Sequence, residues 1–447
     1  MKGKSVLLIN PWIYDFAAYD LWAKPLGLLY LGGLLRENGC EIHLIDCLSR
    51  FHPFMHDKTP KSKVNGHGKY YREIVAKPSA LATFPRNYGR YGISQEAFQY
   101  ELSKLGQPEV VLVSSSMTYW YPGVFEVVRL VKEAWPGVPV VLGGIYASLC
   151  TSHARKYSGA DYIITHEGEI KLLALLSQLW GTKPAYVPDM ADLDTLPYPC
   201  FDLMEQVRYV CLQTSRGCPF RCTYCASHVL WQGLRRRNPA KVVAEIAFWI
   251  SLTGVADFAF YDDALLYNPQ DYAIPLLQAI VTKNIDARFH CPNGLHVRGI
   301  SKEVASLMRQ AGVVTLRLGL ETSSPELQKA SGAKVTNQEF HRAIQNLDSA
   351  GYDVKDVGVY ILCGLPYQTI DEIQASVDLV KSEGARPMIV EYSPIPHTAL
   401  WAEALQSSSY PIEAEPLFQN NSVLACQWEG LTYEMYLSLK RCIQNQG

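Results

Sequence analysis

Thr214-Ser-Arg-Gly-Cys218-Pro-Phe-Arg-Cys222-Thr-Tyr-Cys225 brings three thiols into one short stretch of the chain. Thiolates are soft ligands that suit iron–sulfur clusters or zinc. The gaps of three and two residues let one tight loop wrap a cubane of iron and sulfide, and they leave the fourth iron without a protein ligand. An open iron can bind a further molecule, so this loop predicts a reaction centre.

Two other interpretations of the three cysteines are weaker. Structural zinc sites usually take four ligands, in pairs separated by longer stretches. No second Cys-x-x-Cys occurs in the sequence, and Cys211 and His228 lie outside the usual spacings for a fourth ligand. Three cysteines that merely pack in a core do not fit a loop rich in Arg, Gly, Pro and Thr. An iron–sulfur cluster is therefore favoured.

Length and composition point to a two-domain globular protein. The 447 residues are 48% hydrophobic and 19% charged, which allows a sizeable core. A net charge of −2 gives no overall footprint for nucleic acid or for an acidic membrane surface. No apolar run is long enough to span a bilayer, and the nine cysteines outside the loop stand singly in apolar surroundings, as reduced core thiols do. We expect a cytoplasmic protein with neither a membrane nor a nucleic-acid partner.

The first half of the chain alternates apolar runs with helical stretches. The runs lie at residues 6–11, 41–46, 110–113, 138–144 and 162–165. This alternation predicts a parallel, doubly wound sheet, in which ligands bind beyond the carboxyl ends of the strands. No Gly-x-Gly-x-x-Gly loop is present, so a nicotinamide site has little support. The candidate ligand-binding residues at these ends are Asn10, Ser114, Ser115, Ser116, Gly143, Gly144 and Glu167.

The second half has the same alternation and ends in a helical tail. Six strands are expected at residues 209–213, 257–261, 287–291, 315–320, 357–362 and 387–392, the first of which delivers the cysteine loop. Barrels of parallel strands place their chemistry at the carboxyl face. After residue 400, an amphipathic helix is expected to begin with Thr432 as its N-cap.

The cysteine loop, entered from an apolar strand, resembles the signature of the radical S-adenosylmethionine (SAM) enzymes, and the first half resembles the cobalamin-binding domain that precedes many of their cores. The resemblance implies an α/β fold with an N-terminal doubly wound, Rossmann-like domain, a partial (β/α)6 TIM-like barrel and a short helical C-terminal tail. We place these parts at residues 1–188, 207–399 and 400–447, with a linker at 189–206 and an insertion at 51–106.

The resemblance also implies three cofactors: a [4Fe-4S] cluster, SAM and cobalamin. The cluster would be held by Cys218, Cys222 and Cys225, and the methionine part of SAM would chelate the open iron. The residues that stand where the family binds SAM are Tyr224, Asp262, Asp263, Arg317, Glu321 and Gly364. The family's Gly-Gly-Glu is absent, and Asp262 and Asp263 occupy its place. His397, in the exit segment of the barrel, is a candidate proton carrier by position only, because loop histidines are more often structural.

For cobalamin, the implied site comprises the seven residues at the strand ends of the first half, with glycine needed where the backbone must approach the nucleotide tail closely. One feature departs from the pattern. The Asp-x-His-x-x-Gly motif, which supplies a histidine below cobalt in many cobalamin proteins, is absent. Its absence argues against a histidine ligand to cobalt more than against cobalamin binding itself.

Residues 51–106 interrupt the alternation and interleave basic with aromatic residues. Such a pattern can indicate nucleic-acid binding. The overall charge instead favours a solvated excursion whose aromatic side chains pin it to the domain. A stretch of this length in a compact domain usually has a function. We expect that it covers the corrin or closes over the substrate.

The function implied by the resemblance is methylation of an unactivated carbon in a small biosynthetic substrate. SAM would be cleaved reductively to a 5′-deoxyadenosyl radical that takes a hydrogen atom from the substrate, and methylcobalamin would supply the methyl group. An electron donor such as a flavodoxin or ferredoxin is the expected partner. Two alternatives stay open: a radical cyclase or rearrangement enzyme without methyl transfer, and a non-catalytic corrinoid or redox sensor. A sensor would need an output module or a DNA-binding domain, and the sequence shows neither.

Overall fold

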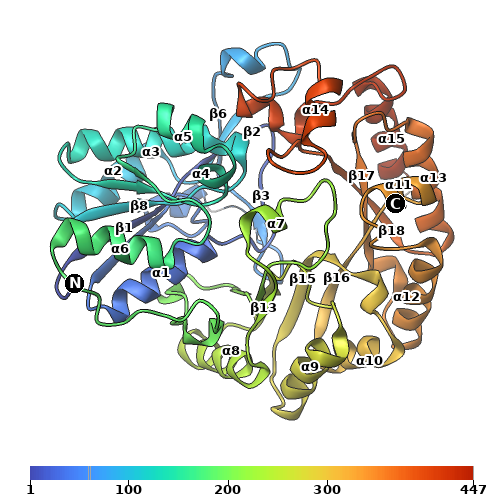
Figure 1. The fold of residues 1–447 in the computed structure, drawn as a ribbon, viewed down its shortest axis with the longest axis horizontal. Helices are drawn as coiled ribbons and strands as arrows, with labels where there is room; N and C mark the ends of the chain where they lie inside the picture. Colours follow the sequence, from blue (N-terminus) through green and yellow to red (C-terminus); the bar gives the residue numbers. More distant parts are fainter. Residues whose placement is uncertain (59, 61, 446–447) are drawn as a thin grey trace. The chain divides into compact units, whose positions relative to one another are not determined.

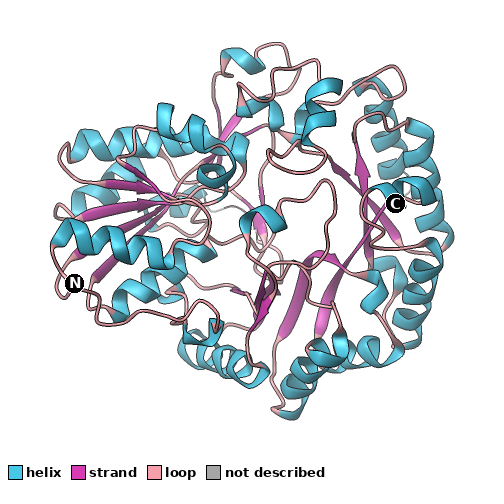
Figure 2. Cartoon of the chain, viewed as in Figure 1, coloured by secondary structure: helices cyan, strands magenta, loops and turns pink. Residues whose placement is uncertain are grey.

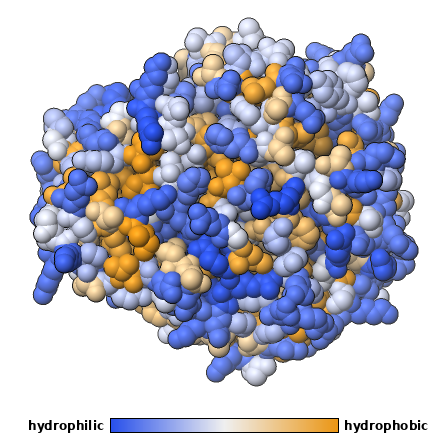
Figure 3. All heavy atoms as spheres, in the orientation of Figure 1, coloured by the Kyte–Doolittle hydropathy of each residue, from blue (hydrophilic) through white to orange (hydrophobic). Residues whose placement is uncertain are grey.

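The computed structural model describes residues 1–58, 60 and 62–445. The chain forms two compact units, Met1–Val210 and Cys211–Gly447, which are described separately below (Figure 1). On the face drawn in Figure 3, hydrophilic residues predominate and apolar residues gather in small patches. Within the described part of the chain, no helix combines the length and the apolar character needed to cross a membrane.

The first unit is built on a five-stranded sheet. Its strands are β1 (Ser5–Asn10), β4 (Glu41–Asp46), β8 (Val110–Val113), β9 (Val140–Leu142) and β10 (Tyr162–Ile163), in the order β10-β9-β8-β1-β4. All neighbouring pairs are parallel. Every residue of β8 and β9 is buried, because a parallel sheet covered on both faces needs continuously apolar strands. The five predicted strands are therefore confirmed.

Helices cover both faces of this sheet. They are α1 (Leu26–Glu37), α2 (Gln95–Lys104), α3 (Tyr121–Ala134), α4 (Ile145–Leu149), α5 (Thr151–Tyr157) and α6 (Glu169–Trp180). Figure 1 shows α1 and α6 on one face and α2, α3 and α5 on the other, the arrangement of a doubly wound fold. Helix α1 ends at Asn38-Gly39, where Gly39 adopts a φ of +80°, a conformation that glycine enters without a steric penalty.

The segment expected as an insertion folds back onto the chain that follows β1. It contributes β5 (Gly68–Lys69), β6 (Arg72–Ile74) and β7 (Gly89–Tyr91), along with the 3-10 helices Pro53–Lys58 and Ser79–Leu81. Strands β7 and β6 extend β2 (Ile13–Asp15) into an antiparallel sheet, and β5 pairs with β3 (Tyr19–Asp20). Tyr70, Tyr71, Tyr88 and Tyr91 are all buried. The expectation that aromatic side chains pin this segment to the domain is thus confirmed.

The second unit contains a six-stranded sheet. Its strands, in both sequence and spatial order, are β11 (Val210–Leu212), β14 (Asp257–Phe260), β15 (Arg288–Leu295), β16 (Val313–Glu321), β17 (Gly358–Cys363) and β18 (Arg386–Glu391). The pairs from β14 to β18 are parallel. Each of the six predicted strands is confirmed.

Helices follow the strands on the outside of this sheet, as Figures 1 and 2 show. The larger ones are α8 (Pro239–Thr253), α9 (Ala273–Thr282), α10 (Lys302–Gln310), α12 (Asn337–Ser349) and α13 (Ile370–Ser382). The shorter elements are β12 (Ser215–Arg216), β13 (Arg235–Arg236), α7 (Ser227–Leu230), α11 (Pro325–Ala330) and α14 (Trp401–Ser407). The regular β–α alternation of one strand per helix is that of a partial barrel.

The C-terminal helix α15 (Tyr433–Asn445) begins where the sequence predicted. The backbone N–H of Met435 donates to Oγ1 of Thr432 over 3.3 Å, so Thr432 is the N-cap. Glu391, the last residue of β18, accepts hydrogen bonds from the hydroxyl of Tyr436 and from Nζ of Lys440. Because Glu391 is mostly buried, this polar contact ties α15 to the end of the last barrel strand.

Candidate functional site

The cysteine loop leaves the end of β11 and is closed by a short hairpin. Ser215 and Arg216 in β12 pair antiparallel with Arg236 and Arg235 in β13. Gly217 follows with a φ of +88°, and a Cβ atom at this position would stand 2.0 Å from the carbonyl oxygen of Gly233. Only glycine permits this close approach of the two chains. The loop from Cys218 to Cys225 therefore starts from a fixed base.

The three thiols lie close enough together for their charges to affect one another's pKa values. Burial raises the pKa of Cys225 to about 11, and the charges of Cys218 and Cys222 act on it in the same direction. Tyr224 shares a hydrogen bond with the sulfur of Cys222, and the backbone N–H of Ser227 donates to Sγ of Cys225 over 3.4 Å. Thiols with raised pKa values lose their protons only when a strong cation stabilises the thiolates, which coordinated iron does.

Within the described residues, no set of three or more His, Cys, Asp or Glu side chains is arranged to hold a single metal ion. A cubane makes a different demand, since each of its irons takes its own thiolate and the three sulfurs do not converge on one point. The donor set, three thiols in one loop, thus fits a cluster with one open iron.

Asp262, at the carboxyl end of β14, holds the two residues that lead into the cysteine loop, Thr214 and Ser215. Its Oδ1 accepts hydrogen bonds from Oγ1 of Thr214 (2.8 Å) and from Oγ of Ser215 (2.5 Å), while its Oδ2 accepts the backbone N–H of Thr214 (3.2 Å). Burial raises the pKa of Asp262 to about 6, against the lowering effect of these donors. We expected Asp262 to bind SAM. Its carboxylate is buried and accepts three hydrogen bonds from the chain, and a contact with SAM stays a prediction.

Asp263 differs from Asp262 although it is the next residue. Its side chain is exposed, and its Oδ2 accepts a single hydrogen bond, from Oγ of Ser227 over 2.6 Å. Its negative charge acts on both Cys218 and Cys225. Of the two neighbouring carboxylates, Asp263 is therefore the one available to a ligand beside the cysteine loop.

Glu321 ends β16 in an unusual backbone conformation. Its φ is +67°, and the pairing of β16 with β17 shifts register between Gly319 and Glu321. Such bulges and left-handed residues re-aim a side chain and occur often at functional sites. Oε1 of Glu321 stands 3.3 Å from Nζ of Lys334. A Cβ atom on Gly319 would meet both groups at less than 3 Å, so the glycine makes room for the pair.

Lys334 brings a positive charge to the cysteine loop. Its side chain is only 14% exposed. Burial acts to lower the pKa of Lys334, but the nearby Glu321 carboxylate and Cys222 outweigh it, and the pKa of Lys334 lies above its ordinary value. Sequence reasoning missed this residue, because a lysine in the polar turn between α11 and α12 carries no pattern that distinguishes it from a solvated one.

His296 follows β15 and contacts the cysteine loop at Phe220. Its ring stacks on that of Phe220, between the first two cluster cysteines, with centroids 4.2 Å apart and planes at 15°. Burial lowers the pKa of His296 to about 3, so the ring is neutral. Among the described residues, its buried Nδ1 has no hydrogen-bond partner. Sequence reasoning missed His296 as well.

The other predicted residues of this unit are Arg317, Gly364 and His397. Arg317 stands four residues before Glu321, about 13 Å along the strand, pairs with the first residue of β17, and donates to the carbonyl oxygen of Leu316. Gly364 has a φ of +94°, and its N–H donates to Oε1 of Gln368. His397 is exposed with a φ of +68°. Roles for Arg317 and Gly364 in binding SAM, and for His397 as a proton carrier, therefore stay predictions.

In the first unit, two predicted residues meet at the switch point of the sheet. Strand order reverses between β1 and β8, and this is where doubly wound sheets bind ligands. Asn10 ends β1 and Ser114 follows β8. Oγ of Ser114 donates to Oδ1 of Asn10 over 3.3 Å, and Nδ2 of Asn10 donates to the buried Asp46 over 2.7 Å.

Ser115 and Gly144 lock the neighbouring loops together. Oγ of Ser115 donates to the carbonyl oxygen of Gly143 over 2.6 Å and accepts the N–H of Ala147 over 3.2 Å. Gly144 has a φ of +99°, and a Cβ atom there would lie 2.2 Å from the carbonyl oxygen of Ser115. Ser115 is thus occupied by the chain itself. The side chain of Ser116 and the residue Gly144 are exposed at this edge, and Glu167 is half-buried.

Two family matches agree with this geometry. Residues 212–380 match the Radical SAM superfamily, and residues 91–176 match the B12 binding domain. The first range contains the whole cysteine loop and strands β14 to β17, and the second contains β8 to β10 with the loops that follow them.

Relatives of known sequence and structure cover most of the chain. The cytidylyl-2-hydroxyethylphosphonate methyltransferase of Streptomyces wedmorensis is 23% identical over 86% of this chain and 78% of its own length. The anaerobic magnesium-protoporphyrin IX monomethyl ester cyclase of Cereibacter sphaeroides is 23% identical over 85% of this chain and 60% of its own length. The radical SAM methyltransferase TsrM of Kitasatospora setae, solved with tryptophan and a SAM analog, superposes with a TM-score of 0.66 at 17% identity, covering 90% of this chain and 76% of TsrM.

The fold and the cysteine loop together define an iron–sulfur enzyme in which a partial barrel accompanies a doubly wound, ligand-binding unit. The two family matches then identify a radical SAM domain at residues 212–380 and a B12-binding domain at residues 91–176. Its cofactors are accordingly a [4Fe-4S] cluster, SAM and cobalamin. The predicted fold class is confirmed.

The sheet edge of the first unit offers a direct test of cobalamin binding. Replacing Gly144 by alanine places a Cβ atom against the Ser115 carbonyl and forces a left-handed φ on a residue that disfavours it. At a local cost of about 2 kcal/mol, we expect the affinity for cobalamin to fall at least about tenfold. Cobalamin bound per chain, measured from corrin absorbance after reconstitution, reports the effect. Gly137→Ala is the control, because nothing lies within 4 Å of its Cβ position; equal cobalamin content in both variants would remove this edge from the site.

Proposed function

We propose that the protein methylates an unactivated carbon of a small substrate, using SAM and cobalamin. The observation that carries the proposal is the presence, in one chain, of the open three-cysteine loop and of a B12-binding domain. A cytidylyl-2-hydroxyethylphosphonate methyltransferase is similar over 86% of this chain. The residue roles that follow belong to the same proposal.

When bound, the cluster supplies the electron that cleaves SAM, and cobalamin supplies the methyl group. The chain's own contribution is to bind and orient these groups and to exclude water. Cys218, Cys222 and Cys225 hold the cluster. Asp263 offers a carboxylate to the ammonium of SAM, and Lys334 offers a positive charge to its carboxylate, since both act on the cysteine loop.

Lys334 can be tested through SAM binding alone. Lys334→Met keeps the length of the side chain and removes its charge, so we expect SAM to bind about tenfold more weakly to the reconstituted protein, the loss expected for one charge-assisted hydrogen bond. Equilibrium binding under anaerobic conditions measures the change. Lys329→Met is the matched control, because Lys329 is exposed on the adjacent helix α11. An unchanged affinity in Lys334→Met would exclude Lys334 from the SAM site.

A second candidate function keeps the cofactors but lacks methyl transfer. It is favoured by the similarity to the anaerobic magnesium-protoporphyrin IX monomethyl ester cyclase. Product mass distinguishes the two, because only methylation, which replaces a hydrogen atom by a methyl group, adds the mass of CH2. Formation of 5′-deoxyadenosine with a product of unchanged carbon count would favour the cyclase or rearrangement chemistry.

The whole proposal is tested on anaerobically purified protein. Iron and sulfide content together with mass analysis of bound corrinoid should show both cofactors, and reduction in the presence of SAM and substrate should release 5′-deoxyadenosine. An electron donor such as a flavodoxin or ferredoxin, and a cytoplasmic location, complete the proposal. A protein that bound cobalamin but released no 5′-deoxyadenosine with any candidate substrate would contradict it.

A further inference from the structure

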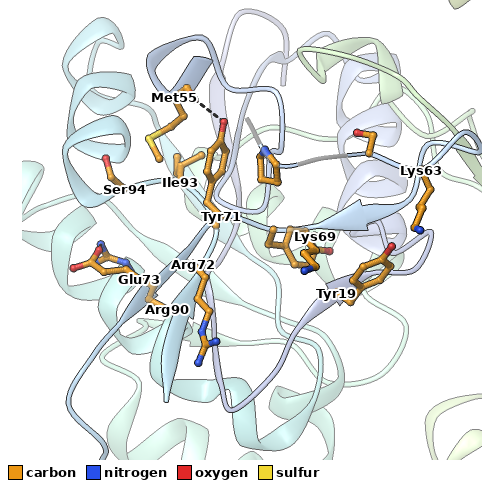
Figure 4. A pocket seen from close by; sticks show the side chains of 14 residues that line it. Tyr19, Met55, Lys63, Lys69, Tyr71, Arg72, Glu73, Arg90, Ile93 and Ser94 are labelled. Carbon is orange, nitrogen blue, oxygen red and sulfur yellow. Dashed lines mark hydrogen bonds and ion pairs between the residues drawn. The ribbon is translucent and has the colours of Figure 1, made fainter. Parts of the chain in front are cut away.

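A cavity of about 870 Å3 lies among the strands of the segment that interrupts the first unit (Figure 4). Its volume falls within the range of small-molecule sites. The walls come from β3, β5, β6 and β7, from the 3-10 helix Pro53–Lys58, from the chain just before α2, and from Pro60, Ser62 and Lys63. None of the residues assigned above to the cluster, to SAM or to cobalamin lines it.

The charges along these walls do not balance. Four cationic residues line the cavity, Lys63, Lys69, Arg72 and Arg90, against one carboxylate, that of Glu73. Glu73 is already engaged, because its Oε2 accepts a hydrogen bond from Arg90 over 2.5 Å. In the part of the chain that the structure describes, no carboxylate pairs with the other three cations. The excess is local, since the chain as a whole carries a net charge of −2.

A buried arginine holds the wall that carries Lys63 and Lys69. Arg50 is 2% exposed and donates to the carbonyl oxygens of Gly66 and Lys69 and to Oγ of Ser62. Its own charge is neutralised by Asp20 at 3.1 Å. The backbone on both sides of the two lysines is thus fixed by a neutral ion pair, while their ammonium groups stay available. A preorganised wall lowers the entropy lost on binding.

Three tyrosine rings, those of Tyr19, Tyr70 and Tyr71, also line the cavity. Tyr19 pairs with Lys69 across β3 and β5, and its hydroxyl lies 3.1 Å from Nδ1 of His67. The hydroxyl of Tyr71 donates to the carbonyl oxygen of Met55 over 2.7 Å. Figure 4 shows Tyr71 in the middle of the cavity, with Lys63, Lys69 and Tyr19 toward one end and Met55 toward the other. Aromatic faces beside two ammonium groups suit a ligand with a flat apolar body and an anionic head.

We propose that this cavity binds an organic phosphate or phosphonate whose ring-bearing body lies against Tyr71 and whose anionic group lies between Lys63 and Lys69. Two ammonium groups match the double charge of a phosphate monoester, and lysine binds phosphate as a point charge. The site is a binding site in its own right, independent of the cluster and of methyl transfer.

The test uses the full chain and phenyl phosphate as the probe, with phenol and inorganic phosphate as its two halves. Isothermal titration should show that phenyl phosphate binds at least tenfold more tightly than either half. The double variant Lys63→Gln/Lys69→Gln should lose at least tenfold in affinity for phenyl phosphate, and Lys63→Arg/Lys69→Arg should retain binding because it keeps both charges. Thermal unfolding confirms that the variants remain folded.

The matched control is Lys104→Gln/Lys156→Gln, which removes two exposed lysines of the same unit that lie outside the cavity. It should bind phenyl phosphate as the unaltered protein does. An equal loss of affinity in both double variants would mean that only the overall charge of the protein matters, and it would overturn the proposal. Equal binding of phenol and phenyl phosphate, or failure of all three probes to bind at millimolar concentration, would overturn it as well.

Discussion

Replacing Cys218, Cys222 and Cys225 by alanine is expected to abolish cluster binding and reductive cleavage of SAM together. In the proposed function the three thiols are the protein ligands of the cluster, so the open iron that SAM needs would be lost with the cluster. The loss in 5′-deoxyadenosine formation should exceed the roughly 10–100-fold typical of changes to groups that only support a metal ligand. Iron content after anaerobic reconstitution and the yield of 5′-deoxyadenosine under reduction measure the two effects.

Cys442→Ala provides the control for this experiment. Cys442 is the exposed cysteine of α15, outside the loop, so its loss should change neither iron content nor cleavage. Cobalamin content should also stay unchanged in the triple variant, because the B12-binding match lies entirely within the first unit. Cleavage of SAM that survives in the triple variant would exclude the loop as the reaction centre.

Most of the fold could be predicted because the signals that specify it are local. The run Val110–Val113 is apolar at every position, which predicts a strand covered on both faces, and all four residues are buried. The small antiparallel sheet of β2, β6 and β7 was not predicted. Its strands are three residues long and pair residues such as Ile13 and Tyr91, far apart in sequence, and no local period reports such a contact.

The residues of the candidate site could also be predicted only where the signal is local. The cysteine spacing is a local pattern, so the loop could be identified directly. Lys334 and His296 reach the loop only through the fold: one from a turn beyond β16, the other from the end of β15. For Arg317, a shared role with Glu321 in binding SAM stays a prediction. This arginine stands in the same stretch as Glu321, but a strand separates residues four apart by about 13 Å, and the register places Arg317 opposite Gly358 at the start of β17.

Asp262→Ala is expected to destabilise the second unit by about 2–4 kcal/mol. Three donors would lose their acceptor, two hydroxyls and the N–H of Thr214, and each buried donor left unpaired costs about 1–3 kcal/mol. Burial raises the pKa of Asp262, so removing the carboxylate relieves an unfavourable buried charge and returns part of this cost. Chemical denaturation of the apoprotein measures the net change.

Asp263→Ala should separate structural support from ligand binding. Asp263 is exposed and accepts one hydrogen bond, so its loss should change stability by less than about 0.5 kcal/mol. SAM affinity should nevertheless fall about tenfold, because a charge-assisted hydrogen bond to the ammonium would be missing. The adjacent carboxylates then give opposite results in the two assays. Equal losses of SAM affinity at unchanged stability in both variants would assign Asp262 to the SAM site and remove its role as the tie between β14 and the cysteine loop.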